Sequence, residues 1–282
     1  MTMISINTNY GGIFAAKASS QSQATVDSAM ERLSTGKRIN FAKDDAAGQA
    51  IATRLNAEVD GLAMASRNAA DAQSMLDTAE GALSETHTIL LRMRELAVQS
   101  ANGTLTNNDR LHTDAEFQQL EAEILRISDK TKWAGKALID GSNDGSDATN
   151  KPALSFQVGE GSGQTIAVSI NGMDPTDLSL NNNGVSTAAK AQTAITALDT
   201  AIATVSTERG KLGAYSNRLT STMNNLDQVG INLSASKGRI EDADFAAETG
   251  NLAKGQILQQ AATAMLAQAN ASKSSILTLV RG

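Results

Sequence analysis

The sequence contains no cysteine, and only 3% of its 282 residues are aromatic. The absence of cysteine excludes disulfide bonds, thiol nucleophiles and thiolate metal sites. It leaves the compartment open, because both cytosolic and secreted proteins can lack cysteine. The scarcity of aromatic rings removes the side chains that usually fill a globular interior. We therefore expect thin seams between helices, lined largely by alanine.

Proline, positive charge and long apolar runs are also scarce. The two prolines, Pro152 and Pro175, leave room for unbroken helices on either side of them. The net charge is −6 and no lysine- or arginine-rich tract occurs, which argues against nucleic acid as a partner. No segment reaches the roughly 18 uninterrupted apolar residues of a membrane span. The N-terminus has no basic stretch followed by an apolar one, so we predict no cleavable secretory signal.

Apolar residues recur at alternating steps of four and three along both halves of the chain. From Ile51 to Ala97, twelve of fourteen such positions are apolar, which predicts a coiled-coil seam. At the helical rise, this segment forms a rod of about 70 Å. The same pattern predicts a second long helix from Ala191 to Leu233 and a shorter one over residues 114–128. These three helices are expected to share one bundle.

Weaker apolar stripes predict a helix at each end of the chain. The same step near the C-terminus gives Leu258, Met265, Ile276 and Leu279. A looser stripe near the N-terminus consists of Ile6, Tyr10, Ile13, Val26, Met30 and Leu33. Each terminal helix alone would be marginal in water, so they need one another or other copies of the chain.

The hydrophobic period changes from helical to alternating between the two helical halves. Apolar and polar residues alternate over residues 154–158 and 166–170, and the glycine-rich "GEGSGQ" lies between them. This pattern predicts a β-hairpin or a pair of short strands. The predicted fold is mainly α: a long antiparallel helical coiled-coil bundle with a small β-hairpin region near 133–180, at the far tip.

Lys43, Asp44 and Asp45 form a charged cluster just before the first long helix. A catalytic acid/base pair or a metal site needs further converging ligands, and the local sequence supplies none. The favoured interpretation is that one Asp caps the helix while the neighbouring carboxylate interacts with the positive end of its dipole. We predict no catalytic, metal or cofactor-binding residue, and no cofactor.

Three long motifs resemble the N- and C-terminal regions of bacterial flagellin. They are "ERLSTGKRINFAKDDAAGQAIATRL", "RMRELAVQSANGT" and "RIEDADFAAETGNLAKGQILQQAATAMLAQAN". The resemblance implies a structural, non-enzymatic subunit that polymerises into the flagellar filament and serves motility. It implies an inner coiled-coil domain of residues 1–43 plus 239–282 and a rod domain of residues 44–238. The middle is too short for inserted outer domains.

The resemblance also implies partners and locations for the predicted site residues. Neighbouring subunits would bury the Leu258, Met265, Ile276 and Leu279 seam, and the charges of the Lys43, Asp44 and Asp45 cluster would lie at the joint between domains. A type III export apparatus would secrete the chain to the extracellular filament with its signal uncleaved. An export chaperone would hold the C-terminal segment, and a filament cap would receive the subunit.

Flagellins with Arg-x-Arg-Glu-Leu in the first long helix, and a Glu on the next, are recognised by the vertebrate Toll-like flagellin receptor. Arg92, Leu96 and Glu116 match those positions, and we expect Arg92 and Leu96 on neighbouring or outward faces of the helix.

The chain departs from the flagellin pattern at two places. Gly11 and Gly12 put the start of the first helix in doubt. Trp133 and Ala134 stand where many flagellins carry Phe-Asn, so a turn-favouring Asn is lost. Two alternative functions remain open: a hook-filament junction protein, and a coiled-coil binding or signalling module.

Overall fold

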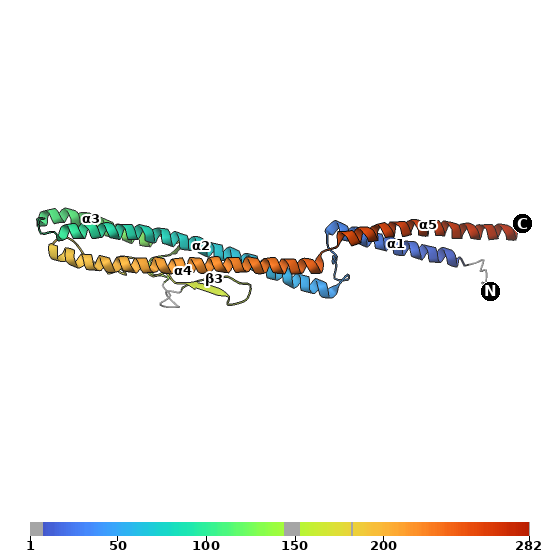
Figure 1. The fold of residues 1–282 in the computed structure, drawn as a ribbon, viewed down its shortest axis with the longest axis horizontal. Coiled ribbons are helices and arrows are strands. Elements are labelled where there is room, and N and C mark those ends of the chain that lie inside the picture. Colours follow the sequence, from blue (N-terminus) through green and yellow to red (C-terminus); the bar gives the residue numbers. More distant parts are fainter. Residues whose placement is uncertain (1–7, 144–152, 182, 282) are drawn as a thin grey trace. The chain divides into compact units, whose positions relative to one another are not determined.

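The computed structural model describes residues 8–143, 153–181 and 183–281, and Figure 1 shows the order of its elements. The helices are α1 (Tyr10–Thr35), α2 (Ala46–Ala101), α3 (Asn107–Lys130), α4 (Ala188–Glu241) and α5 (Phe245–Arg281). The strands are β1 (Lys132–Trp133), β2 (Lys136–Ala137), β3 (Leu154–Gln157) and β4 (Thr165–Val168). None of the helices in the described ranges combines the length and apolar character that crossing a bilayer requires.

The chain divides into two compact units. One, called here the terminal unit, comprises Met1–Ala57 and Asn232–Gly282, and the other, the rod unit, comprises Glu58–Ile231. The boundaries lie inside α2 and α4. The terminal unit therefore holds α1 and α5, and the rod unit holds α3 and strands β1 to β4.

The rod unit is built on the predicted seams. Of the predicted α2 positions from Ile51 to Ala97, all but Ile51 and Glu58 are buried. On α4, the alternate seam residues are at most 2% exposed: Ala191, Leu198, Val205, Leu212 and Leu219. Both long seams and the mainly α fold are thus confirmed, and alanine lines much of the α2 seam, as the composition indicates.

Side-chain contacts across α2 and α4 give the direction of packing. Within the rod unit the pairs are Ser66–Asp227, Gln73–Ser216, Glu80–Arg209 and Arg94–Asp199. Partner numbers fall along α4 as they rise along α2, so the two helices are antiparallel. Arg209 Nη2 and Glu80 Oε1 form an ion pair in this seam, at a distance of 2.7 Å. A polar pair in an apolar seam favours the helix register that brings its two members together over shifted registers.

The shorter predicted helix is α3, which begins seven residues earlier than expected. Thr106 caps it, and the side chain of Asp109 accepts a hydrogen bond from the Thr106 backbone in return. The hydrogen bonds from Thr106 hold the pKa of Asp109 below its usual value. Phe117 and Ile124 of α3 are fully buried, so the third helix of the bundle is confirmed.

Arg110 is a buried cation at the connection between α2 and α3, with 6% of its surface exposed. Its guanidinium donates to the Ser100 carbonyl at 2.8 Å and to the Asn102 carbonyl at 3.0 Å. It also donates to Asn107 Oδ1 at 3.0 Å. These carbonyls lie at or just beyond the C-terminal end of α2, where backbone acceptors lack helical partners. Arg110 therefore supplies hydrogen-bond donors to the carbonyls at the C-terminal end of α2.

We expect Arg110→Ala to lower the free energy of unfolding of the rod unit by about 3 kcal/mol, since it leaves the buried Ser100 carbonyl without its hydrogen-bond donor. Denaturant unfolding followed by circular dichroism measures the change. Arg126→Ala is the matched control on α3: its ion pair with Glu123 is exposed and should be worth about 0.5 kcal/mol or less. Equal losses in the two variants would contradict this role.

The predicted β-hairpin is present as β3 and β4. These strands pair antiparallel from Leu154↔Val168 to Gln157↔Thr165, and Ile166 and Val168 enter the core. Its predicted place at the far tip is wrong. The Asn68 side chain, on α2, donates to the Gln157 carbonyl at 3.0 Å, so the hairpin lies along the helices (Figure 1). Its buried face needs a helical surface to cover it, which a tip does not offer.

A second, smaller hairpin follows α3 and was not predicted as a separate element. β1 and β2 pair through Trp133↔Lys136, and the two residues between them have positive φ angles, 47° at Ala134 and 83° at Gly135. This is the backbone of a type I′ turn, which favours Asn or Gly at both positions. Ala134, which stands where many flagellins carry Asn, is therefore the first residue of this turn.

We expect Ala134→Asn to stabilise the rod unit by about 1 kcal/mol, because the left-handed region costs an alanine more than an asparagine. Thermal unfolding of the purified chain measures the gain. Ala134→Val should have the opposite sign, since a β-branched residue tolerates positive φ poorly. A loss of stability with Asn would contradict the assignment of this turn.

Candidate assembly site

The terminal unit is held together by α1 and α5, which pack through small residues. The buried residues of α1 are Gly12, Ala15, Ser22, Val26 and Ala29. The buried positions of α5 with described side chains are Glu248, Gly255 and Ala262, at steps of seven. Pairs across the interface include Asn9–Asn270 at 3.1 Å, Gln23–Gln259 and Arg32–Glu248 at 2.9 Å. The helices are therefore antiparallel, with a seam of seven-residue period.

Gly255 sets how closely the two helices approach. A Cβ atom at this position would lie 2.7 Å from Cγ2 of Val26 and 3.5 Å from its backbone nitrogen. A side chain at position 255 would therefore push α1 and α5 apart. The seam depends on a residue without a side chain.

Large apolar side chains of the terminal unit lie outside this seam. Met265 is 65% exposed, Leu258 47% and Phe14 77%. A groove of about 330 Å³ runs between the helices, lined mainly by apolar atoms, with Phe14 and Met265 among its walls. Ile276 and Leu279, the other two predicted seam residues, belong to the α5 backbone, but their side chains lie outside the described part of the structure.

The predicted N-terminal stripe is largely wrong. Tyr10, Ile13 and Met30 are more than half exposed, whereas Val26 is buried; Ile6 lies outside the described residues. The physical reason is that glycine, alanine and serine allow closer backbone approach than large residues do. The larger side chains are thereby left on the outer face.

The start of α1, which Gly11 and Gly12 put in doubt, is well defined. The helix begins at Tyr10, and the Asn9 side chain accepts a hydrogen bond from the Gly12 backbone N–H at 3.0 Å. A Cβ atom at Gly12 would lie 2.7 Å from the Asn9 side chain. Glycine at this position therefore permits the cap.

Lys43, Asp44 and Asp45 shape the turn that leads into α2. Asp45 Oδ1 accepts from the Gly48 N–H at 2.9 Å, which is a helix cap. Asp44 Oδ2 accepts from the backbone N–H of Phe41 at 3.0 Å. That bond holds the pKa of Asp44 below its usual value, with the Asn40 N–H and Lys43 acting in the same direction. Lys43 Nζ lies 4.9 Å from the centre of the Phe41 ring.

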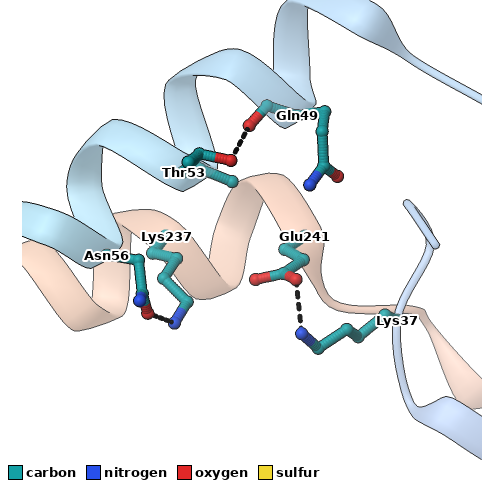
Figure 2. A pocket seen from close by; sticks show the side chains of 7 residues that line it. Lys37, Gln49, Thr53, Asn56, Lys237 and Glu241 are labelled. Atoms are coloured by element: carbon teal, nitrogen blue, oxygen red, sulfur yellow. Dashed lines mark hydrogen bonds and ion pairs between the residues drawn. The ribbon is translucent and has the colours of Figure 1, made fainter. Parts of the chain in front are cut away.

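A clasp between the two connectors of the terminal unit was missed by sequence reasoning. Lys37 bridges to Asp242 in antiparallel fashion, and the Arg38 N–H donates to the Glu241 carbonyl at 2.7 Å. Lys37 Nζ lies 2.5 Å from Oε1 of Glu241, and a dashed line marks this ion pair in Figure 2. Opposite charges in "GKR" and "RIED" were the available signal, but the sequence does not show which distant segments meet.

Arg92 and Glu116 lie together on the surface of the rod unit. Arg92 Nη2 and Glu116 Oε1 are 2.8 Å apart, with about half of each side chain exposed. Leu96 was expected on a neighbouring or outward face, and the outward position is wrong: it is only 2% exposed. It belongs to the same core cluster as Phe117 of α3, so a second packed face of α2 buries it.

Comparison with known proteins assigns this helical arrangement to a family. Residues 6–144 match the bacterial flagellin N-terminal helical region, and residues 195–280 match the bacterial flagellin C-terminal helical region. The chain belongs to the bacterial flagellin family. It is a structural subunit of the flagellar filament, without a large inserted domain.

Relatives match along nearly the whole chain. Flagellin of Halalkalibacterium halodurans is 44% identical over 255 residues, which cover 90% of this chain and 91% of the relative. Flagellin of Bacillus subtilis is 40% identical over 302 aligned positions, covering 98% and 99%. The crystal structure of Bacillus cereus flagellin is 36% identical, with a TM-score of 0.49, covering 57% of this chain and 88% of that one.

Proposed function

We propose that polymerisation of this chain is coupled to ordering of α1 and α5. The observation that carries the proposal is that large apolar residues of both helices lie outside their mutual seam. Fixing backbone costs about 1 to 2 kcal/mol per residue, and a seam of glycine, alanine and serine buries little area to offset it. Burial of Leu258, Met265 and Phe14 by neighbouring subunits supplies the missing stabilisation, at about 25 cal/mol per Å².

The terminal helices that order on assembly belong to an inner domain, which comprises residues 1–43 plus 239–282 and assembles into the filament core. Residues 44–238 form the rod domain. The capped turn at Lys43, Asp44 and Asp45 links them along the N-terminal half, and its exposed charges contact neighbouring subunits. The Ile276 and Leu279 positions extend the contact surface of α5.

The chain reaches the filament by secretion without cleavage of a signal. A type III export apparatus carries it, an export chaperone covers the C-terminal segment beforehand, and the filament cap receives it. The exposed apolar residues of α5 support a chaperone, because such a surface favours association before export. The role of the chain is structural, not catalytic.

Electron microscopy of appendages sheared from the cell, with mass identification of their protein, tests this function. We expect long filaments composed mainly of this chain. A junction protein would be found in few copies at one end of the filament, and a coiled-coil binding or signalling module would not be found in it. Either result would overturn the proposed role.

Recognition by the vertebrate Toll-like flagellin receptor is a second, incidental property that we propose for Arg92, Leu96 and Glu116. The exposed Arg92–Glu116 pair supports a direct contact, whereas buried Leu96 acts by holding α2 in place. Arg92 is therefore the residue to test, because Leu96→Ala would also cost about 2 to 5 kcal/mol of core packing.

We expect Arg92→Asp to weaken reporter-cell signalling by about tenfold or more, as for an arginine at the centre of an interface. Arg126→Asp is the control, since Arg126 is also exposed and paired on a helix surface. Unchanged signalling by Arg92→Asp would show that the receptor does not recognise this surface.

A further inference from the structure

The sequence contains three Asn-Gly pairs, at 102–103, 171–172 and 183–184. We infer that Asn102 is a site of spontaneous deamidation and isoaspartate formation, and that the other two are protected by the fold. The backbone nitrogen of Gly103 attacks Cγ of Asn102 and forms a C–N bond. Nδ2 leaves as ammonia, taking up the proton lost by Gly103. Water then opens the resulting succinimide at either carbonyl, giving aspartate or isoaspartate, with no oxidant or reductant.

The nucleophile at Gly103 is accessible. Asn102 and Gly103 are both exposed and follow the last residue of α2. Within the described part of the chain, the Gly103 N–H has no hydrogen-bond partner. A Cβ atom at Gly103 would meet nothing within 4 Å, so the turn has open space around Gly103.

The electrophile at Asn102 is polarised by its own turn. The Thr104 backbone N–H donates to Oδ1 of Asn102 at 3.2 Å, which folds the side-chain amide back over the following peptide units. A donor at the amide oxygen stabilises the negative charge that develops there when Cγ is attacked. The same hydrogen bond therefore activates the reacting carbon and keeps the side-chain amide beside the turn.

The 171–172 pair is only partly exposed, and its backbone is held. The Asn171 N–H donates to Glu208 at 3.1 Å, and a Cβ atom at Gly172 would lie 2.9 Å from Cα of Gly141. The flanking residues Ile170 and Met173 are fully buried. Cyclisation there requires local opening first, which slows it.

The 183–184 pair is also packed against the rod. Gly184 is buried, and a Cβ atom there would lie 2.8 Å from Oδ1 of Asp114. The next residue, Val185, donates its N–H to the same carboxylate oxygen at 2.6 Å. Neither pair therefore offers a backbone that can turn back on its side chain.

The surroundings of Asn102 favour isoaspartate over aspartate. In isoaspartate the main chain passes through the former side chain, and the former backbone carbonyl becomes a carboxylate. That carbonyl of Asn102 already accepts from Nη2 of Arg110 at 3.0 Å. The product therefore pairs a new negative charge with a buried cation, and it inserts one methylene into the α2–α3 connection.

Incubation of the purified full chain at mildly alkaline pH, followed by peptide mass spectrometry and isoaspartyl methyltransferase labelling, tests the inference. We expect Asn102 to convert at least about tenfold faster than Asn171 and Asn183, because those sites must open first. Isoaspartate should exceed aspartate at position 102. Equal rates at the three sites, or an unchanged Asn102, would overturn the inference.

Gly103→Ala separates the chemistry from folding. Position 103 has an ordinary backbone φ and open space for a methyl group, so the circular dichroism should be unchanged while the added Cβ hinders attack by the backbone nitrogen and slows conversion several-fold. Gly210→Ala, also in open space, should leave the rate at Asn102 unchanged. Conversion of Gly103→Ala at the original rate would contradict the proposed nucleophile.

Discussion

Deletion of residues 255–282 is expected to abolish filament formation completely while the rod unit stays folded. The deletion removes most of α5, including Gly255 and Ala262 of the seam and Leu258 and Met265 of the outer face. Without most of α5, α1 loses the helix against which its buried face packs, and most of the stability of a helix in a protein comes from such packing. Electron microscopy after concentration of the purified protein measures assembly.

The same variant should keep the rod unit intact. The core cluster of the rod lies between Ala69 and Leu219, far in sequence from the deletion. The near-ultraviolet circular dichroism of Trp133, together with the main unfolding transition, should match the full chain. Filaments formed by the truncated chain would refute the proposed role of α5, whereas an unfolded rod would show that the two units do not fold separately.

Gly255→Leu is expected to separate α1 from α5 and to reduce assembly by at least about tenfold. A side chain there meets Val26 at a distance that real Cβ atoms do not tolerate. Overpacking of this kind costs about 3 kcal/mol, a large share of the stability of so thin a seam. Turbidity of polymerising solutions measures assembly, and hydrogen exchange over α1 and α5 in the polymer that still forms measures their separation.

Gly250→Leu is the matched control on the same helix. Gly250 is exposed, and a Cβ atom there would meet nothing within 4 Å. It should fold at least as well as the original chain, because leucine favours helix over glycine by about 0.8 kcal/mol. If Gly250→Leu and Gly255→Leu behave alike, close approach at Gly255 is not what holds the helices together.

The fold of the rod unit could be predicted from periodicity because its seams are long and strongly apolar. An alternation of fours and threes over Ile51–Ala97 has few other interpretations, and the burial of α2 follows it almost position by position. The β3–β4 hairpin was equally readable, since Phe156 and Ile166 alternate with polar residues on either side of a glycine-rich turn. The position of the hairpin along the rod could not be predicted, because the alternating pattern of a strand does not specify which helix covers its buried face.

The terminal unit was harder to predict because large apolar residues mark the wrong face. Residues such as Ile13 and Met30 suggested a stripe, but the seam follows Ala15, Ser22 and Ala29. Small residues such as Ala and Ser contribute little to a pattern of hydrophobic periodicity, although they allow the closest packing of helices. Exposed large residues beside a small-residue seam are typical of a surface that another chain covers.

The charged and surface sites could be predicted only in part, because the sequence does not show which distant segments come into contact. The cap at Asp45 follows from its place before α2, which is local. The clasp joining Lys37 to Glu241 brings together segments 204 residues apart, and no local pattern indicates it. The burial of Leu96 was not predicted because the sequence indicates one seam on α2, whereas Leu96 is part of the rod core outside that seam.

Hydrogen exchange of α1 and α5, compared between the monomer and the assembled filament, tests most directly whether ordering is coupled to polymerisation. Coupled ordering predicts rapid exchange over residues 10–35 and 245–275 in the monomer, with slow exchange in the α2–α4 seam. In the filament, both terminal helices should become protected to the level of the rod. Strong protection of α1 and α5 in the monomer, unchanged on assembly, would contradict it.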